Sequence, residues 1–179
     1  MKLVTDDIEN LKKIEDDFKN LLQITVRDVQ LPKDLEEMLM VYKPCVSSKI
    51  FLHEMFPDDD AGIVLDTDIV VMDDIGKLWQ FFDNFDSQQM AALAPLDTHY
   101  SNVKNMPYYG AVGVGLNAGI MLFNLTRMRN MIGGGFTEAV RFTWQTYKQE
   151  IKLMEQDVLN IIFAKSPRYC ISVRRSYKY

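Results

Sequence analysis

The stretch "GIVLDTDIVVMDDIGKLW", residues 62–79, places two carboxylates in the middle of an apolar run. Apolar residues flank Asp66-Thr67-Asp68 on both sides. A short, nearly continuous apolar run predicts a strand that is buried on both faces of a sheet. Two carboxylates at the end of such a strand repel each other and lose hydration, so either one takes a proton or a cation lies between them. Mg²⁺ or Mn²⁺ fits two oxygen ligands, whereas the alternative is a solvated junction between strand and turn.

Helical and strand patterns alternate along the rest of the chain. Apolar residues at helical spacing predict helices, and short apolar runs bounded by proline or polar residues predict strands. The alternation predicts an α/β sheet with crossover helices. The aromatic residues Trp79, Phe81 and Phe82 are expected in the core. We expect helices at 5–22, 44–56, 78–82, 136–147 and 156–163, and strands at 22–31, 61–71, 90–96 and 115–125, with a further strand beginning in the last ten residues.

Length and composition exclude several classes of protein. The 179 residues suffice for one domain, and a net charge of −5 without a basic stripe disfavours a nucleic-acid partner. We expect no membrane segment in this chain, because no run reaches the roughly 18 apolar residues that a membrane helix needs. The glycines at 110–119 lack GxGxxG spacing and precede a strand rather than a helix, which argues against a dinucleotide-binding loop. Cys45 and Cys170 either form a disulfide or are two buried thiols, and the second interpretation is favoured.

Three segments, in this order, resemble the signatures of the family 8 retaining glycosyltransferases. They are "VLDTDIVVMDDIGKLW" (64–79), "GLNAGIMLFNLTRMR" (115–129) and "MEQDVLNIIF" (154–163). Within the family, "YKPCVSSKIFL" (42–52) and "PYYGAVGVGLNAGIML" (107–122) are most similar to the glucoside xylosyltransferases. The resemblance covers most of the chain, from about residue 22 to about residue 169.

The resemblance implies a GT-A (Rossmann-like) α/β fold with a mostly parallel sheet flanked by helices. It implies one incomplete glycosyltransferase domain over 1–179, truncated at both ends. The implied reaction transfers xylose from UDP-xylose, with retention, through an α-1,3 linkage to O-linked glucose on repeats that resemble epidermal growth factor (EGF-like repeats). The implied compartment is the Golgi or ER lumen. The alternatives within the family are a transferase for another UDP-hexose and an inactive fragment.

The same resemblance assigns the metal and the donor sugar to particular residues. Asp66 and Asp68 would hold Mn²⁺ (or Mg²⁺) against the diphosphate of a UDP-sugar. Asn117, with Ala118 and Gly119 beside it, would contact the donor sugar, because small residues let the backbone come close. An alternative for Asn117 is a plain turn residue.

The third segment supplies the residues implied in catalysis. Gln156 would lie under the reacting anomeric carbon and stabilise positive charge there, while the departing phosphate takes the acceptor's proton. Glu155 and Asp157 would hydrogen-bond sugar hydroxyls. Alternatively, Gln156 and Asp157 only cap the helix that follows. Lys49 lies where the family usually has an arginine near the donor, and its alternative is a solvated lysine.

Some positions depart from the family pattern, and one other family shares part of it. The family's third metal ligand is a histidine in a later segment, and we expect His53 and His99 to be core or loop residues instead. Glu155 stands where the family commonly has aspartate. A haloacid-dehalogenase-type phosphatase would use Asp66 as nucleophile and Asp68 as acid. That alternative needs a Ser or Thr at the end of a second strand and a later acidic pair, which the strands at 90–96 and 115–125 lack.

Overall fold

The fold is taken from a computed structural model, which describes residues 32–41, 44–96, 111 and 115–173. The helix expected at 5–22 and the strand expected at 22–31 lie outside these residues. The helices are α2 (Glu36–Val41), α3 (Pro44–Ser48), α4 (Leu52–Met55), α5 (Ile75–Trp79), α7 (Leu125–Arg129), α8 (Phe136–Tyr147) and α9 (Glu155–Lys165). Short 3-10 helices are η1 (Lys33–Leu35), η2 (Lys49–Phe51), η3 (Gln80–Asn84) and η5 (Pro167–Tyr169), and the strands are β1 (Ala61–Leu65), β2 (Ala91–Pro95), β3 (Leu116–Asn124) and β4 (Cys170–Ser172).

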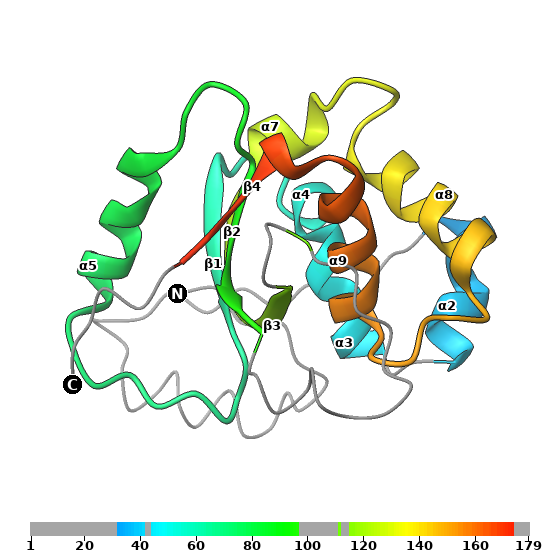
Figure 1. The fold of residues 1–179 in the computed structure, drawn as a ribbon, viewed down its shortest axis with the longest axis horizontal. Helices are drawn as coiled ribbons and strands as arrows, with labels where there is room; N and C mark the ends of the chain where they lie inside the picture. Colours follow the sequence, from blue (N-terminus) through cyan, green and yellow to red (C-terminus); the bar gives the residue numbers. More distant parts are fainter. Residues whose placement is uncertain (1–31, 42–43, 97–110, 112–114, 174–179) are drawn as a thin grey trace.

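The four strands form one mixed sheet in the order β1-β3-β2-β4 (Figure 1). β3 lies between β1 and β2 and is antiparallel to both, whereas β2 and β4 are parallel. The α/β class is confirmed, but the expectation of a mostly parallel sheet is wrong for the described strands. Alternating helices and strands predict parallel neighbours when successive strands pair. Here β3 lies between two strands that precede it in the chain, so β1 and β2 run in the same direction without touching.

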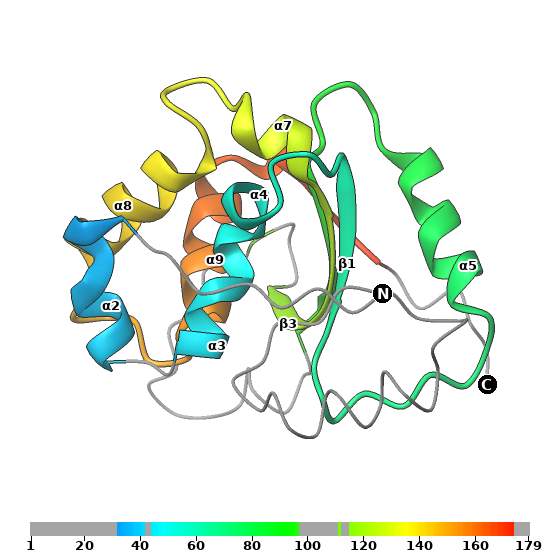
Figure 2. The same ribbon diagram turned by 180° about the vertical axis from the view of Figure 1, so that it is seen from behind.

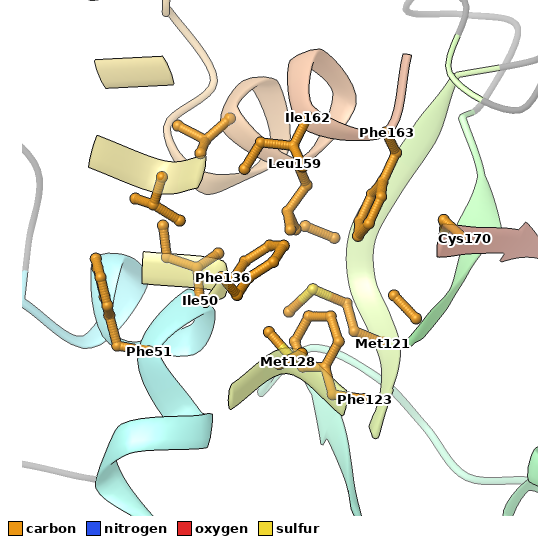
Figure 3. Packing of buried hydrophobic residues seen from close by; sticks show 14 of the residues in the cluster. Ile50, Phe51, Met121, Phe123, Met128, Phe136, Leu159, Ile162, Phe163 and Cys170 are labelled. Carbon is orange, nitrogen blue, oxygen red and sulfur yellow. The ribbon is translucent and has the colours of Figure 1, made fainter. Parts of the chain in front are cut away.

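Helices cover both faces of this sheet (Figure 2). α4, α8 and α9 lie on one side, where α9 contacts β3 and α8, while α5 lies on the other side. Between the helices and β3, Phe136 and Phe163 face each other with 6.1 Å between ring centroids (Figure 3). Met121 and Phe123 of β3 reach into the same apolar cluster from the sheet. This core fixes the sheet against the helices that carry the site.

The apolar run around the paired carboxylates is less buried than its composition predicts. β1 is half-buried along its whole length, and it ends at Leu65. The residues beyond the turn at Asp66 leave the sheet, and Val70 and Met72 are 76 % and 88 % exposed. The strand predicted over 61–71 is therefore confirmed only for 61–65. The prediction of two buried faces is wrong, because β1 lies at the edge of the described sheet and residues 66–71 form a loop.

Three other burial predictions have different outcomes. Trp79 is half exposed, so the expectation that it lies in the core is wrong. It packs on Phe82, 5.0 Å between ring centroids, and Phe82 packs on Phe85, so these aromatics form a small cluster of their own. His53 is buried, as expected for a core residue, and Cys170 is a free buried thiol. Burial raises the pKa of the Cys170 thiol.

Candidate functional site

Three segments meet at one end of the sheet: the turn after β1, the first residues of β3 and the first turn of α9. The backbone N–H of Asp66 donates to the carbonyl of Gly119 across 2.9 Å, which continues the β1–β3 pairing by one residue. The backbone N–H of Ala118 donates to Oε1 of Gln156 across 3.2 Å. These two bonds bring the three family-like segments together at one place.

Lys49, from η2, lies between two carboxylates of this site. Its Nζ donates to Oδ1 of Asp66 and, across 3.1 Å, to Oε1 of Glu155. The Lys49 side chain is 19 % exposed and that of Glu155 is 9 % exposed, whereas that of Asp66 is 33 % exposed. The alternative that Lys49 is merely solvated is therefore wrong.

The electrostatics of the cluster follow from this contact. Burial raises the pKa of Glu155, while Lys49 acts in the opposite direction. Burial alone would lower the pKa of Lys49, but its bonds to Asp66 and Glu155 raise that pKa above its usual value. Lys49 is therefore a permanent cation at neutral pH, and it compensates the nearly buried carboxylate of Glu155.

Gly119 allows two polar side chains to approach the start of β3. Its N–H donates to Oδ1 of Asn117 across 2.8 Å. A Cβ added at Gly119 would lie 2.9 Å from that oxygen and 3.6 Å from Oδ2 of Asp66. Ala118, in contrast, is 3 % exposed and packs in the core, so it presents its backbone rather than its side chain to Gln156.

Asp157 turns toward the loop that precedes α9. Its Oδ2 accepts from the N–H groups of Lys152, across 2.7 Å, and Leu153, across 2.8 Å. Burial raises its pKa, although these backbone bonds act against the shift. The geometry is that of a carboxylate near a helix N-terminus that reaches back to preceding backbone donors. Asp157 thus ties the preceding loop to the first turn of α9, which has no side-chain cap bond at Met154, and a contact of Asp157 with the donor sugar stays a prediction.

Asn160 is a polar residue of this site that sequence reasoning did not single out. It is 5 % exposed, and its amide makes three hydrogen bonds of 2.8 Å each. It accepts from the N–H of Leu116 and donates to the carbonyl groups of Leu116 and Gln156. Asn160 therefore joins α9 to the first residue of β3. The signal in the sequence is one amide inside the apolar run "VLNIIF".

Asp66 and Asp68 supply some of the oxygen ligands that a hard cation requires. Asp66 has its Oδ2 beside the bare Cα of Gly119, and Asp68 is exposed two residues further on. Carboxylate oxygens are the donors that Mn²⁺ and Mg²⁺ take in proteins, and both ions keep positions for phosphate oxygens. Within the described residues, however, no three His, Cys, Asp or Glu side chains gather where they could hold one ion.

Comparison with solved structures identifies the fold. The chain aligns with the galactosyltransferase LgtC, solved with donor and acceptor sugar analogues, at a TM-score of 0.65 and 22 % identity, over 85 % of this chain and 53 % of LgtC. It aligns with mouse xyloside xylosyltransferase 1, in its apo form, at a TM-score of 0.68 and 18 % identity, over 98 % of this chain and 71 % of that one. The fold is thus that of the GT-A glycosyltransferases, which confirms the predicted fold class.

The sequence gives the family within that class. Residues 1–178 match the family model for glycosyl transferase family 8. Glucoside xylosyltransferase 1 of Gallus gallus is 33 % identical over 175 residues, and glucoside xylosyltransferase 2 of Xenopus laevis is 37 % identical over 145 residues. These alignments cover 89 % and 74 % of this chain. The chain belongs to glycosyl transferase family 8 and is closely related to the glucoside xylosyltransferases, so the phosphatase alternative is set aside.

The chain spans 40 % of the length of the Gallus gallus relative and 34 % of that of the Xenopus laevis relative. In the part of the chain that the structure describes, every helix is too short or too polar to cross a membrane.

Proposed function

We propose that this chain carries the donor-sugar site of a retaining, UDP-sugar-dependent glycosyltransferase. The observation that supports this best is the cluster in which Lys49 bridges Asp66 and Glu155 beside the bond between Ala118 and Gln156. In this cluster, carboxylates that suit a cation lie beside the amide oxygen of Gln156, which a backbone N–H holds in place. Residues 1–179 would form one domain of the GT-A type, incomplete relative to the whole family fold.

Asp66 and Asp68 would hold Mn²⁺ or Mg²⁺, which when bound neutralises the diphosphate of the donor. Asn117 and Gly119 would line the donor sugar, since the glycine leaves room for close approach of the sugar to the backbone. Lys49 would balance the negative charge of Glu155 and hold its carboxylate in place below the sugar.

The chemical step would rely on Gln156. Its Oε1 accepts from Ala118, which orients the amide oxygen, and that oxygen would stabilise positive charge on the anomeric carbon. The bond from the anomeric carbon to the phosphate oxygen breaks, and a bond to the acceptor hydroxyl oxygen forms on the same face of the sugar. The proton of that hydroxyl passes to the departing phosphate of UDP.

Kinship with the glucoside xylosyltransferases supports a proposal for the donor and the acceptor. The donor would be UDP-xylose, and the acceptor would be an O-linked glucose on an EGF-like repeat that is extended through an α-1,3 linkage. By the same kinship, the compartment would be the Golgi or ER lumen. Other family 8 members use UDP-hexoses, and an inactive fragment is the further alternative.

The test is a calorimetric titration of UDP into the 179-residue chain, with and without Mn²⁺. We expect binding that requires Mn²⁺ and that is lost in the double variant Asp66→Asn/Asp68→Asn. The matched control is Asp73→Asn/Asp74→Asn, which neutralises an exposed acid pair on the same segment and should bind UDP as the wild type does. Unchanged binding in the Asp66→Asn/Asp68→Asn variant would contradict the metal assignment.

A second experiment separates the donors. Hydrolysis of UDP-xylose, UDP-glucose and UDP-galactose by the chain would be followed through the release of UDP. We expect UDP-xylose to be consumed fastest. Preference for a hexose would support the alternative within the family, and a folded chain that neither binds UDP nor hydrolyses any donor would support the inactive fragment.

A further inference from the structure

The backbone at Lys49 is fixed by neighbouring residues that pack in the core. The two residues that follow it in η2, Ile50 and Phe51, are fully buried among the helices (Figure 3). Its ammonium group therefore emerges from a fixed backbone next to the site. It reaches carboxylates that lie 17 and 106 residues further along the chain, Asp66 after β1 and Glu155 at the start of α9.

The charges of the centre do not cancel. One ammonium group, that of Lys49, bonds to two carboxylates, those of Asp66 and Glu155, and a third carboxylate, Asp68, follows Asp66 by two residues. Oδ1 of Asp66 accepts from the ammonium group, so a metal ion would have to bind Oδ2 of a carboxylate that Lys49 already engages. A divalent cation at the Asp66–Asp68 pair would compete with Lys49 for Asp66, and the two cations would repel each other.

We propose that Lys49 is a resident counter-cation, which occupies Asp66 in the metal-free protein and so weakens binding of a divalent cation until an anionic diphosphate is present. The inference rests on the proposed function, because it takes Asp66 and Asp68 as the cation ligands. The diphosphate brings negative charge that offsets the repulsion between the two cations. Binding of metal and nucleotide is then positively coupled, and the coupling is reciprocal.

The test measures Mn²⁺ binding without nucleotide, by loss of the free Mn²⁺ signal in electron paramagnetic resonance and by calorimetry. Lys49→Met removes the charge and keeps most of the side-chain length. We expect it to bind Mn²⁺ about tenfold to a hundredfold more tightly than the wild type, because a like charge on the same carboxylate is removed at a partly screened site. Lys49→Arg retains the charge and should stay within about threefold of the wild type.

Lys77→Met is the matched control. Lys77 pairs with Asp73 across 2.7 Å on the exposed face of α5, so this variant removes the same charge and an ion pair on the segment that follows Asp68. We expect its Mn²⁺ affinity to stay within about twofold of the wild type. A tightening equal to that of Lys49→Met would mean that net charge alone sets the affinity, and it would overturn the proposal.

The coupling gives a second readout. Addition of UDP should tighten Mn²⁺ binding strongly in the wild type and by a much smaller factor in Lys49→Met. If Lys49→Met leaves Glu155 unpaired and fails to fold, Lys49→Met/Glu155→Gln removes both charges and should still bind Mn²⁺ more tightly than the wild type.

The outcomes separate this proposal from the proposed function. If Lys49→Met binds Mn²⁺ no more tightly than the wild type, while Asp66→Asn/Asp68→Asn abolishes binding, the counter-cation role is overturned and the metal site remains. If Asp66→Asn/Asp68→Asn binds Mn²⁺ as the wild type does, the metal assignment fails and the counter-cation role fails with it.

Discussion

Replacement of Asn160 by leucine tests whether its amide holds α9 to the start of β3. The pairing of β1 with β3 ends at Ile120, and the last backbone bond there is the one from Asp66 to Gly119. Beyond that point on this edge of β3, the N–H and the carbonyl of Leu116 bond to the Asn160 side chain, while β2 pairs with β3 along its other edge. Leucine has a similar volume and can make neither bond, so Asn160→Leu removes the connection without opening a large cavity.

The expected cost follows from the groups that lose their partners. Leu116 is fully buried, so its N–H and its carbonyl group would both be left unsatisfied. At about 1–3 kcal/mol for each such group, the two together cost about 2–6 kcal/mol. The carbonyl of Gln156 contributes little, because it also accepts a bond within α9. A domain is stable by only about 5–15 kcal/mol, so the loss would be a large part of the total.

The assay is denaturant unfolding of the purified chain, followed by circular dichroism. Asn130→Leu is the matched control, because Asn130 is exposed and its amide makes one bond, to the carbonyl of Thr126. We expect the control to lose less than about 1 kcal/mol, as is usual for surface substitutions. If Asn160→Leu were no less stable than Asn130→Leu, the reasoning that Asn160 closes the edge of β3 would be refuted.

Two further predictions concern the glycine of the site and the buried histidine. Gly119→Ala should destabilise the chain by about 0.5–1.5 kcal/mol, because its Cβ would push away the Asn117 side chain and break the bond from the Gly119 N–H. Gly62→Ala in β1, with nothing within 4 Å of its Cβ, should change stability by less than about 0.5 kcal/mol. Thermal melting compares the two variants. Burial lowers the pKa of His53 to about 4, with Glu54 opposing the shift, so the folded state favours the neutral ring. Stability present above pH 6.5 should therefore fall by up to about 3 kcal/mol as the pH drops toward 4, and His53→Gln should show a smaller fall in denaturant titrations at pH 7.5 and 4.5.

Elements with a strong local pattern were predictable from the sequence. Helix α8 has the predicted bounds of 136 and 147, and α9 begins one residue before the predicted start. The predicted helix over 44–56 is present as α3, η2 and α4 in succession. In each case the apolar spacing coincides with burial in the described core, so the local signal and the tertiary packing agree.

The prediction failed where the outcome depends on a neighbouring segment. The residues after Asp66 are as apolar as those of β1, yet they leave the sheet and expose Val70 and Met72. Apolar composition does not reveal whether a strand has a partner on both sides. Nor does it reveal whether neighbouring strands are parallel, because that depends on the position of β3 in the strand order.

Inside the site, Asp157 makes contacts that are local in the sequence, whereas Lys49 makes contacts that depend on the fold. Asp157 finds its partners in the backbone of Lys152 and Leu153, five and four residues away, so this contact is local in the sequence. Lys49 finds its partners 17 and 106 residues away, where only the fold brings them. The resemblance to family 8 therefore picked out three segments that the fold brings together, but not the ion pairs of Lys49 with Asp66 and Glu155. Because one of these pairs engages a carboxylate that we propose as a metal ligand, we expect metal binding to depend on a contact that no short motif encodes.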